Sequence, residues 1–201
     1  MAVLLLNIAS PMQSWGTELK LKDHPTQSYP SKSGIIGLIA SSEGRKRSDD
    51  IRDLARLMVG VRIDRPGVIT TDYQTACIRK NVSDTKIDDK YRYVGHRYFL
   101  CDAKFTAAIS GEKALLEDIA YNLRHPANAL FFGRRCFPVN ADLVVGIFDE
   151  ELDESLHSHG FTPGMTIIED TERDGDRMVR DVPVSFDFRK RQWEYRMIIV
   201  R

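Results

Sequence analysis

The chain has 201 residues, of which 42% are hydrophobic and 29% are charged, and its formal net charge is zero. This length and composition favour one domain, or one domain with a small appendage, and exclude a small protein that needs disulfide staples. The neutral total argues against a nucleic-acid binder that is basic over its whole surface.

The charges are unevenly distributed along the chain. Residues 149–176 contain 10 acidic residues and one basic residue, so the remainder carries 28 basic against 19 acidic residues, an excess of +9. A polyanion could dock on the basic part while the acidic segment faces solvent or a basic neighbour. The alternative is that both regions are ordinary solvated surface.

The first third of the chain predicts a buried strand, two helices and two short strands. Residues 2–8 are an apolar run of strand length, without a preceding basic region and too short for a membrane span, so we expect a cytoplasmic protein with no membrane segment. The elements expected next are a helix over 34–43 capped by Ser33, a helix from Ser48 that ends before Gly60, and strands 61–64 and 68–73 on either side of a turn.

The middle of the chain combines one irregular segment with regular patterns. Residues 76–95 are polar and too long for a usual connection, so they form either a disordered loop or a projecting hairpin. Residues 99–109 alternate strictly between apolar and other side chains, which is the period of a half-buried strand. A helix is expected over 112–124, followed by short strands at 130–132 and 143–148.

The order of these elements predicts the fold class. Strand, helix, strand, strand, helix, strand is the order of the ferredoxin-like split βαβ unit, which also underlies the RNA recognition motif. Beyond it lie a short helix, strand 165–168, segment 178–186 and strand 193–200. We therefore expect an α+β protein with a ferredoxin-like palm over 1–148 and a small β-rich C-terminal region over 149–201 that packs back on the core.

Two loops near the N-terminus carry side chains suited to RNA. Gln13 can hydrogen-bond a base edge and Trp15 offers a face for base stacking, although a loop closed by a buried Trp is the competing reading. Residues 29–34 lead into a helix N-terminus, where free N–H groups with Lys32 and Ser33 would form a phosphate cradle. The pattern is not that of a P-loop, so nucleotide hydrolysis is not expected.

A third loop opens with Gly133 and continues with Arg134 and Arg135. Planar guanidinium groups take two phosphate oxygens each, and glycine lets the backbone come close. Adjacent arginines on a surface turn are common, so the motif is weak on its own.

Few residues suggest catalysis. The five histidines (His24, His96, His125, His157 and His159) show no metalloprotease spacing. His96, with Tyr and Lys neighbours, is the one cluster suited to acid–base work on RNA. The cysteines, Cys77, Cys101 and Cys136, are far apart, which predicts buried free thiols and no zinc site.

Together, these segments resemble the CasD family of subunits of the type I-E CRISPR Cascade complex, in the RAMP superfamily. The matching segments are 11–16 (PMQSWG), 29–38 (YPSKSGIIGL), 72–75 (DYQT), 98–106 (YFLCDAKFT), 133–135 (GRR) and 191–195 (RQWEY). The chain departs from the family pattern at Ser31, where relatives have Thr, at Gln74, where they have His, and at Cys136-Phe137, where they have Ser-Cys. Cys136 is therefore not given the role of a family cysteine.

The resemblance implies a non-catalytic subunit that binds the 5′ handle of the CRISPR RNA for antiviral defence, without metal or cofactor. The implied partners are the backbone subunit CasC, the large subunit CasA and, through the complex alone, target DNA. The RNA-binding residues would be Gln13, Trp15, Lys32, Ser33, Gly34, Gly133, Arg134 and Arg135. A projecting β-hairpin thumb over about 76–97 would carry Lys80, Lys86, Lys90, Arg92 and His96.

Two other functions remain open from the sequence. Type I-C relatives process their own repeat RNA by metal-independent attack of a 2′-hydroxyl, which needs a general base and acid. Here His96 with its neighbours, or His24 with Tyr29, would have to supply them. The remaining alternative is an unrelated single-strand RNA binder.

Overall fold

The computed structural model describes all residues except 1, 17–22, 78–91, 163–164, 172–174 and 188. Its fold is α+β, and the described strand pairs are antiparallel apart from one. A seven-stranded sheet has the order β10-β11-β9-β4-β7-β1-β8. Its strands are β1 (Ala2–Ala9), β4 (Met58–Arg65), β7 (Lys104–Gly111), β8 (Val144–Phe148), β9 (Thr166–Thr171), β10 (Arg177–Ser185) and β11 (Gln192–Val200).

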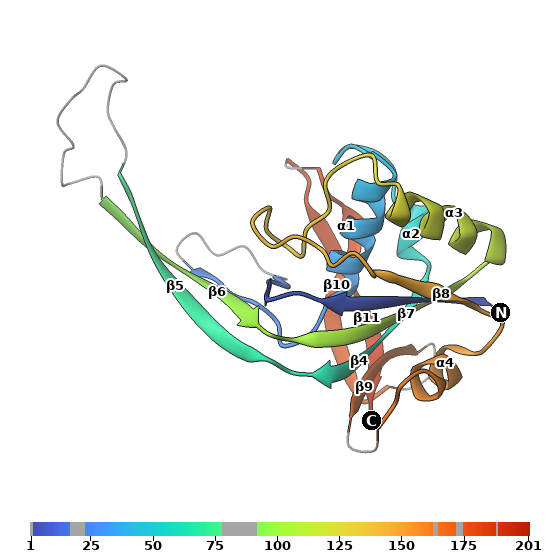
Figure 1. Ribbon diagram of the computed structural model, residues 1–201. Helices are drawn as coiled ribbons and strands as arrows, with labels where there is room; N and C mark the ends of the chain where they lie inside the picture. Colours follow the sequence, from blue (N-terminus) through green and yellow to red (C-terminus); the bar gives the residue numbers. More distant parts are fainter. Residues whose placement is uncertain (1, 17–22, 78–91, 163–164, 172–174, 188) are drawn as a thin grey trace.

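The second sheet is built around one long antiparallel pair, β5 (Val68–Cys77) and β6 (Arg92–Cys101). The short strands β2 (Met12–Gln13) and β3 (Asp23–His24) pair with the C-terminal half of β6. Figure 1 shows β5 and β6 extending away from the body of the molecule. The two strands pair in continuous register from Val68 with Cys101 to Cys77 with Arg92, so the described part of the segment expected as a loop or hairpin is a hairpin.

Helices cover both faces of the large sheet (Figure 1). One face carries α1 (Lys32–Ser42), α2 (Arg52–Ala55) and α3 (Lys113–Arg124), and the other carries α4 (Leu152–Ser158). Successive side chains of β1 point to opposite faces of the sheet. Leu4 and Leu6 pack in the core with α1 and α3, while Val3 and Leu5 pack with α4. The prediction that the first strand is buried on both faces is confirmed. No helix in the described residues is long and apolar enough to cross a membrane.

Two expected elements are shorter than the sequence suggested. The helix expected from Ser48 is the single turn α2, and its C-terminal part is strand β4. Gly60 lies inside that strand, where a Cβ atom would come within 2.7 Å of Leu156 on α4, so the glycine allows close packing and does not end a helix. The strand expected over 130–132 is reduced to one bridge between Phe131 and Pro138.

The alternating stretch 99–109 is two strands in different sheets. Asp102, between β6 and β7, has a φ of 55°, in the left-handed region where an extended strand cannot continue. Its N–H donates to the carbonyl of Pro11, which fixes the corner. Apolar residues continue to alternate with other residues across this corner. The sequence pattern alone therefore does not reveal that the strand ends there.

The C-terminal strands continue the large sheet. β9 pairs with β4, and β11 pairs with β9, so residues 166–200 extend the sheet that β1, β7 and β8 complete on the other side. Strands from both sides of the expected division between residues 148 and 149 therefore belong to the same sheet.

A buried ionic cluster joins these C-terminal strands to the start of α1. The Nζ of Lys32 lies 2.8 Å from an Oδ2 atom of Asp170 on β9, and the guanidinium of Arg196 on β11 contacts both Asp170 and Asp181. One carboxylate oxygen of Asp181 also accepts the backbone N–H of Lys32 at 2.8 Å. All four side chains are at most 8% exposed. Each charge is therefore stabilised by its charged partners and not by water.

Replacement of Asp170 by Ala should destabilise the protein by about 3 to 5 kcal/mol, because it leaves Lys32 and Arg196 with a buried, under-compensated charge. Urea unfolding followed by circular dichroism measures the loss. The control is Asp50→Ala, which removes an exposed ion pair with Arg52 and should leave the unfolding midpoint nearly unchanged. Equal midpoints for the two variants would contradict a stabilising role for the cluster.

Candidate nucleic-acid interface

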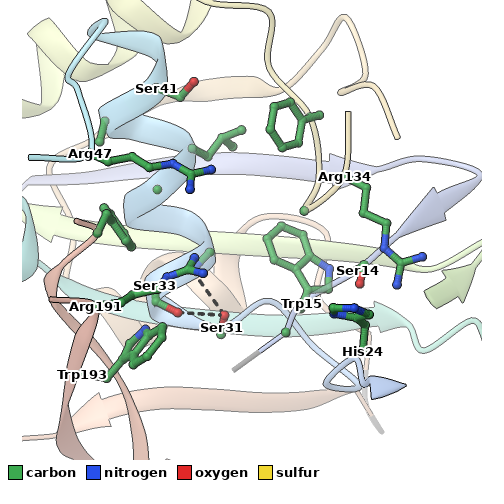
Figure 2. Close-up of a pocket in the computed structure, with 18 of the residues that line it drawn as sticks. Ser14, Trp15, His24, Ser31, Ser33, Ser41, Arg47, Arg134, Arg191 and Trp193 are labelled. Carbon is green, nitrogen blue, oxygen red and sulfur yellow. Dashed lines mark hydrogen bonds between the residues drawn. The ribbon is translucent and has the colours of Figure 1, made fainter. Parts of the chain in front are cut away.

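A cleft of about 570 Å³ lies beside α1 and is enclosed by segments from distant parts of the chain (Figure 2). Its floor is formed by one side of α1, from Ser33 to Ser41, and by the loop that follows β2. The walls are the segment after α1, the turn at Gly133, β6, and the connection between β10 and β11. The residues that line it include Ser14, Trp15, His24, Ser33, Gly34, Arg45, Lys46, Arg47, Arg97, Gly133, Arg134, Arg191 and Trp193.

The lining has one sign of charge, and we call this site the basic cleft. Six of its residues are cationic at neutral pH, namely Arg45, Lys46, Arg47, Arg97, Arg134 and Arg191. No Asp or Glu of the described residues is among the lining. A hollow lined by one sign of charge concentrates the electric field and attracts counter-ions, here anions.

The cations differ in how far the protein already neutralises them. Arg45 forms two hydrogen bonds with Asp53 and an ion pair with Glu43. For Arg47, Arg97, Arg134 and Arg191 there is no ion pair with a carboxylate anywhere in the described part of the chain. Four guanidinium groups of the cleft are therefore available to an anion.

These four form two like-charged pairs. Burial, and then the charge of Arg97, lower the pKa of Arg134, whose guanidinium donates to the carbonyl of Tyr98 at 2.9 Å. Burial, and then the charge of Arg47, lower the pKa of Arg191. A bound anion would relieve the repulsion within each pair, because it lies close to both positive charges.

The turn that carries Arg134 requires glycine. Gly133 has a φ of +84°, and a Cβ atom there would lie 1.8 Å from the carbonyl oxygen of Ser14. The N–H of Ser14 donates to the carbonyl of Phe132 at 3.1 Å, so the turn rests directly on the loop after β2. This contact sets the position of the wall from which Arg134 projects.

The helix terminus expected to hold a phosphate is already occupied. Ser31, and not Ser33, caps α1, because its hydroxyl accepts the N–H of Gly34. The N–H and ammonium groups of Lys32 are bound by Asp181 and Asp170, and the side chain is 6% exposed. The protein's own carboxylates thus occupy the cradle expected at Lys32, and binding of RNA by Lys32 stays a prediction. Ser33 and Gly34 do line the basic cleft.

Gln13 and Trp15 are buried beneath the cleft and not presented to a base. Their exposed fractions are 0% and 2%. The amide of Gln13 donates to the carbonyl of Ala103 at 2.8 Å and accepts the indole N–H of Trp15 at 3.1 Å. The indole packs on Phe132 and lies so close to Gly34 that a Cβ there would come within 2.7 Å. Both side chains support the floor of the cleft, as the competing reading of a loop closed by a buried Trp expects, and their contact with RNA stays a prediction.

Of the remaining expected residues, the structure describes only some. Lys80, Lys86 and Lys90 fall outside the described residues, as does the side chain of Arg92 at the start of β6. Arg135 is exposed and does not line the cleft, and its role in RNA binding stays a prediction.

The two histidines considered for catalysis lie on neighbouring strands, because β3 and β6 pair Asp23 with His96 and His24 with Arg97. His24 lines the cleft, whereas the Nδ1 of His96 lies 3.2 Å from Asp23 at the base of the hairpin. Cys101 is partly exposed and Cys136 exposed, contrary to the expected buried thiols.

Sequence reasoning missed Arg47, Arg97, Arg191 and Trp193. Two signals pointed to three of them. Residues 45–47 (RKR) are three consecutive cations after a helix end, and Arg191 and Trp193 lie within the matching segment 191–195 (RQWEY). Arg97 has no such signal. Nothing in the sequence shows that these segments share a cleft.

Comparison with known proteins gives consistent matches. The family model described as CRISPR-associated protein (Cas_Cas5) matches residues 3–201. The CRISPR system Cascade subunit CasD of Escherichia coli (strain K12) is 28% identical over 159 residues, which cover 71% of this chain and 70% of that protein. A chain of a CRISPR RNA-guided surveillance complex has a TM-score of 0.81 at 31% identity, with 99% of this chain and 89% of that chain covered. A crystal structure of a Cas protein has a TM-score of 0.75 at 33% identity, with 99% and 93% covered.

Replacement of Gly133 by Ala should distort the cleft wall and lower the free energy of unfolding by more than about 1 kcal/mol, because it combines a positive φ with a backbone collision. Thermal unfolding measures the effect. Gly16→Ala is the control, since its Cβ would lie 3.4 Å from the nearest atom, a carbonyl oxygen of Pro25. A Gly133 variant as stable as the Gly16 variant would show that the turn adapts.

Proposed function

The chain belongs to the CRISPR-associated Cas5 family, and from this premise we propose that it is a Cascade subunit that holds the 5′ handle of the CRISPR RNA in its basic cleft. The matches to a Cascade subunit and to a chain of an RNA-guided surveillance complex support this role. As a component of that assembly it works beside other subunits, and we place it in the cytoplasm.

One observation carries the proposal: the basic cleft has six cations and no carboxylate among its described lining residues. Phosphate contacts supply most of the affinity of proteins for nucleic acids and fix the position of the strand. Splayed single-stranded segments fit a hollow of this kind better than an RNA duplex does, because their backbone can follow a curved wall. The net charge of zero is compatible with this role, since the acidic segment lies elsewhere in the sequence.

The fold supports a division into palm and thumb. The strand order β4-β7-β1-β8, with α1 and α3 on one face, is the order of a ferredoxin-like sheet, and we assign it as the palm. The projecting β5–β6 hairpin is then the thumb, with Val68, Ile69 and Tyr73 more than half exposed along β5. Exposed apolar side chains on a strand suit contact with a protein, and we propose CasC as that neighbour and CasA as a second partner.

We propose further that the subunit does not cut its RNA. The acid and base for attack by a 2′-hydroxyl must both reach one phosphate. His24 lines the basic cleft, but His96 does not, and its ring is engaged by Asp23. The matches to a Cascade subunit and to a chain of a surveillance complex favour a holding role over the endoribonuclease alternative.

Arg134→Ala should weaken binding of single-stranded handle RNA and flatten the slope of log K against log salt by about 0.7, which corresponds to one lost phosphate contact. Arg135→Ala is the matched control, because this neighbouring arginine is exposed and lies outside the cleft lining. Fluorescence anisotropy over a salt series measures both. Equal losses for the two variants would place the RNA elsewhere on this turn.

Repeat RNA incubated with the purified chain in EDTA should remain intact on a denaturing gel, and the variant with His24→Ala and His96→Ala should give the same pattern. Specific cleavage by the unaltered chain that disappears in the variant would instead establish a metal-independent endoribonuclease.

A further inference from the structure

The basic cleft has two ends, and each carries one of the like-charged pairs. Figure 2 shows Arg134 beside His24 and Ser14 at one side, and Arg47, Arg191 and Trp193 at the opposite side, with Trp15 between them. The first end is formed by the second sheet and the Gly133 turn, whereas Arg191 immediately precedes β11 and Trp193 lies on it.

The second end is an ordered site and not a pair of loose surface side chains. The guanidinium carbon of Arg191 lies 5.3 Å from the centroid of the Trp193 ring, a cation–π contact that limits the positions of the charge. Trp193 is itself held by the register of β11 against Pro183 on β10. Arg47 approaches from the segment after α1, and burial together with its charge lowers the pKa of Arg191. The site therefore concentrates positive charge without a carboxylate partner in the described residues.

We propose that Arg47 and Arg191 clamp one internal phosphodiester of the RNA, forming a second subsite opposite Arg134, and that Trp193 is a positioning residue for Arg191. This inference rests on the proposed function. Two guanidinium forks can bind different oxygens of one phosphate, and the anion removes their mutual repulsion. The RNA strand then runs along the cleft from the Gly133 turn to the C-terminal strands, and residues 149–201 take part in RNA binding.

A shared phosphate predicts strong coupling between the two arginines. Arg47→Ala and Arg191→Ala should each weaken the binding of handle RNA about tenfold and flatten the salt slope by up to about 0.7. The double variant should lose little more than either single variant, because the same phosphate contact is already impaired. Arg189→Ala is the control, since Arg189 is exposed in the turn before β11 and does not line the cleft.

Trp193→Leu tests the positioning role. It should weaken RNA binding in the otherwise unaltered chain but have no further effect when Arg191 is already Ala, while thermal unfolding remains close to that of the unaltered protein. An undiminished effect in the Arg191→Ala background would show that Trp193 contacts RNA directly and is not a positioning residue.

The outcomes separate the subsite from the proposed function. If Arg134→Ala weakens binding but the Arg47 and Arg191 variants bind as the unaltered chain does, the second subsite is absent and the function stands. Independent, additive losses would overturn the shared phosphate. If the unaltered chain, alone and within a reconstituted complex, shows no affinity for handle RNA, the proposed function itself fails.

The position of the phosphate in the strand is tested with RNAs that end in a 5′-hydroxyl or a 5′-phosphate. An internal phosphodiester predicts the same coupling with both RNAs. Coupling confined to the 5′-phosphorylated RNA would overturn the internal assignment and place the strand terminus at this end of the cleft.

Discussion

The cluster of Lys32, Asp170, Asp181 and Arg196 is the constraint on which the basic cleft depends. Its four charges come from α1, β9, β10 and β11, and each is stable away from water because the others are present. The contact fixes the C-terminal strands against the start of α1. Arg191 and Trp193 precede Arg196 on the same segment of the chain. The ionic cluster therefore also fixes the position of the cleft wall that these two residues form.

Local patterns were sufficient to predict much of the body of the fold. The apolar run of β1 indicated a buried strand, and the helix expected over 112–124 is α3, which buries Leu116, Ile119, Ala120 and Leu123. These predictions hold because the periodicity of a strand or a helix is imposed by the core it packs against. The order of the elements likewise predicted an α+β fold, since it restricts the strand arrangements that short connections allow.

The functional residues were harder to predict, because their environment is set by distant segments. Lys32 is followed by a helix and looks like a phosphate ligand, yet its carboxylate partners lie 138 and 149 residues further along the chain. The sequence left open whether Trp15 stacks on a base or closes a loop as a buried side chain, and the missing side chain of Gly34 leaves room for its ring beneath the helix. The arginines of the cleft come from four separate segments, and only the folded sheet brings them together.

The carboxylate of Asp181 at the start of α1 has a consequence for how the affinity for RNA can change. A helix N-terminus recognises an anion through backbone N–H groups, which no substitution removes except one by proline. Here Asp181 occupies that position, so under the proposed function the RNA is recognised by side chains that line the cleft. The arginines that line the cleft lie outside α1, so replacing one of them leaves the helix unchanged. The affinity for RNA can therefore change in small steps during evolution while the fold stays the same.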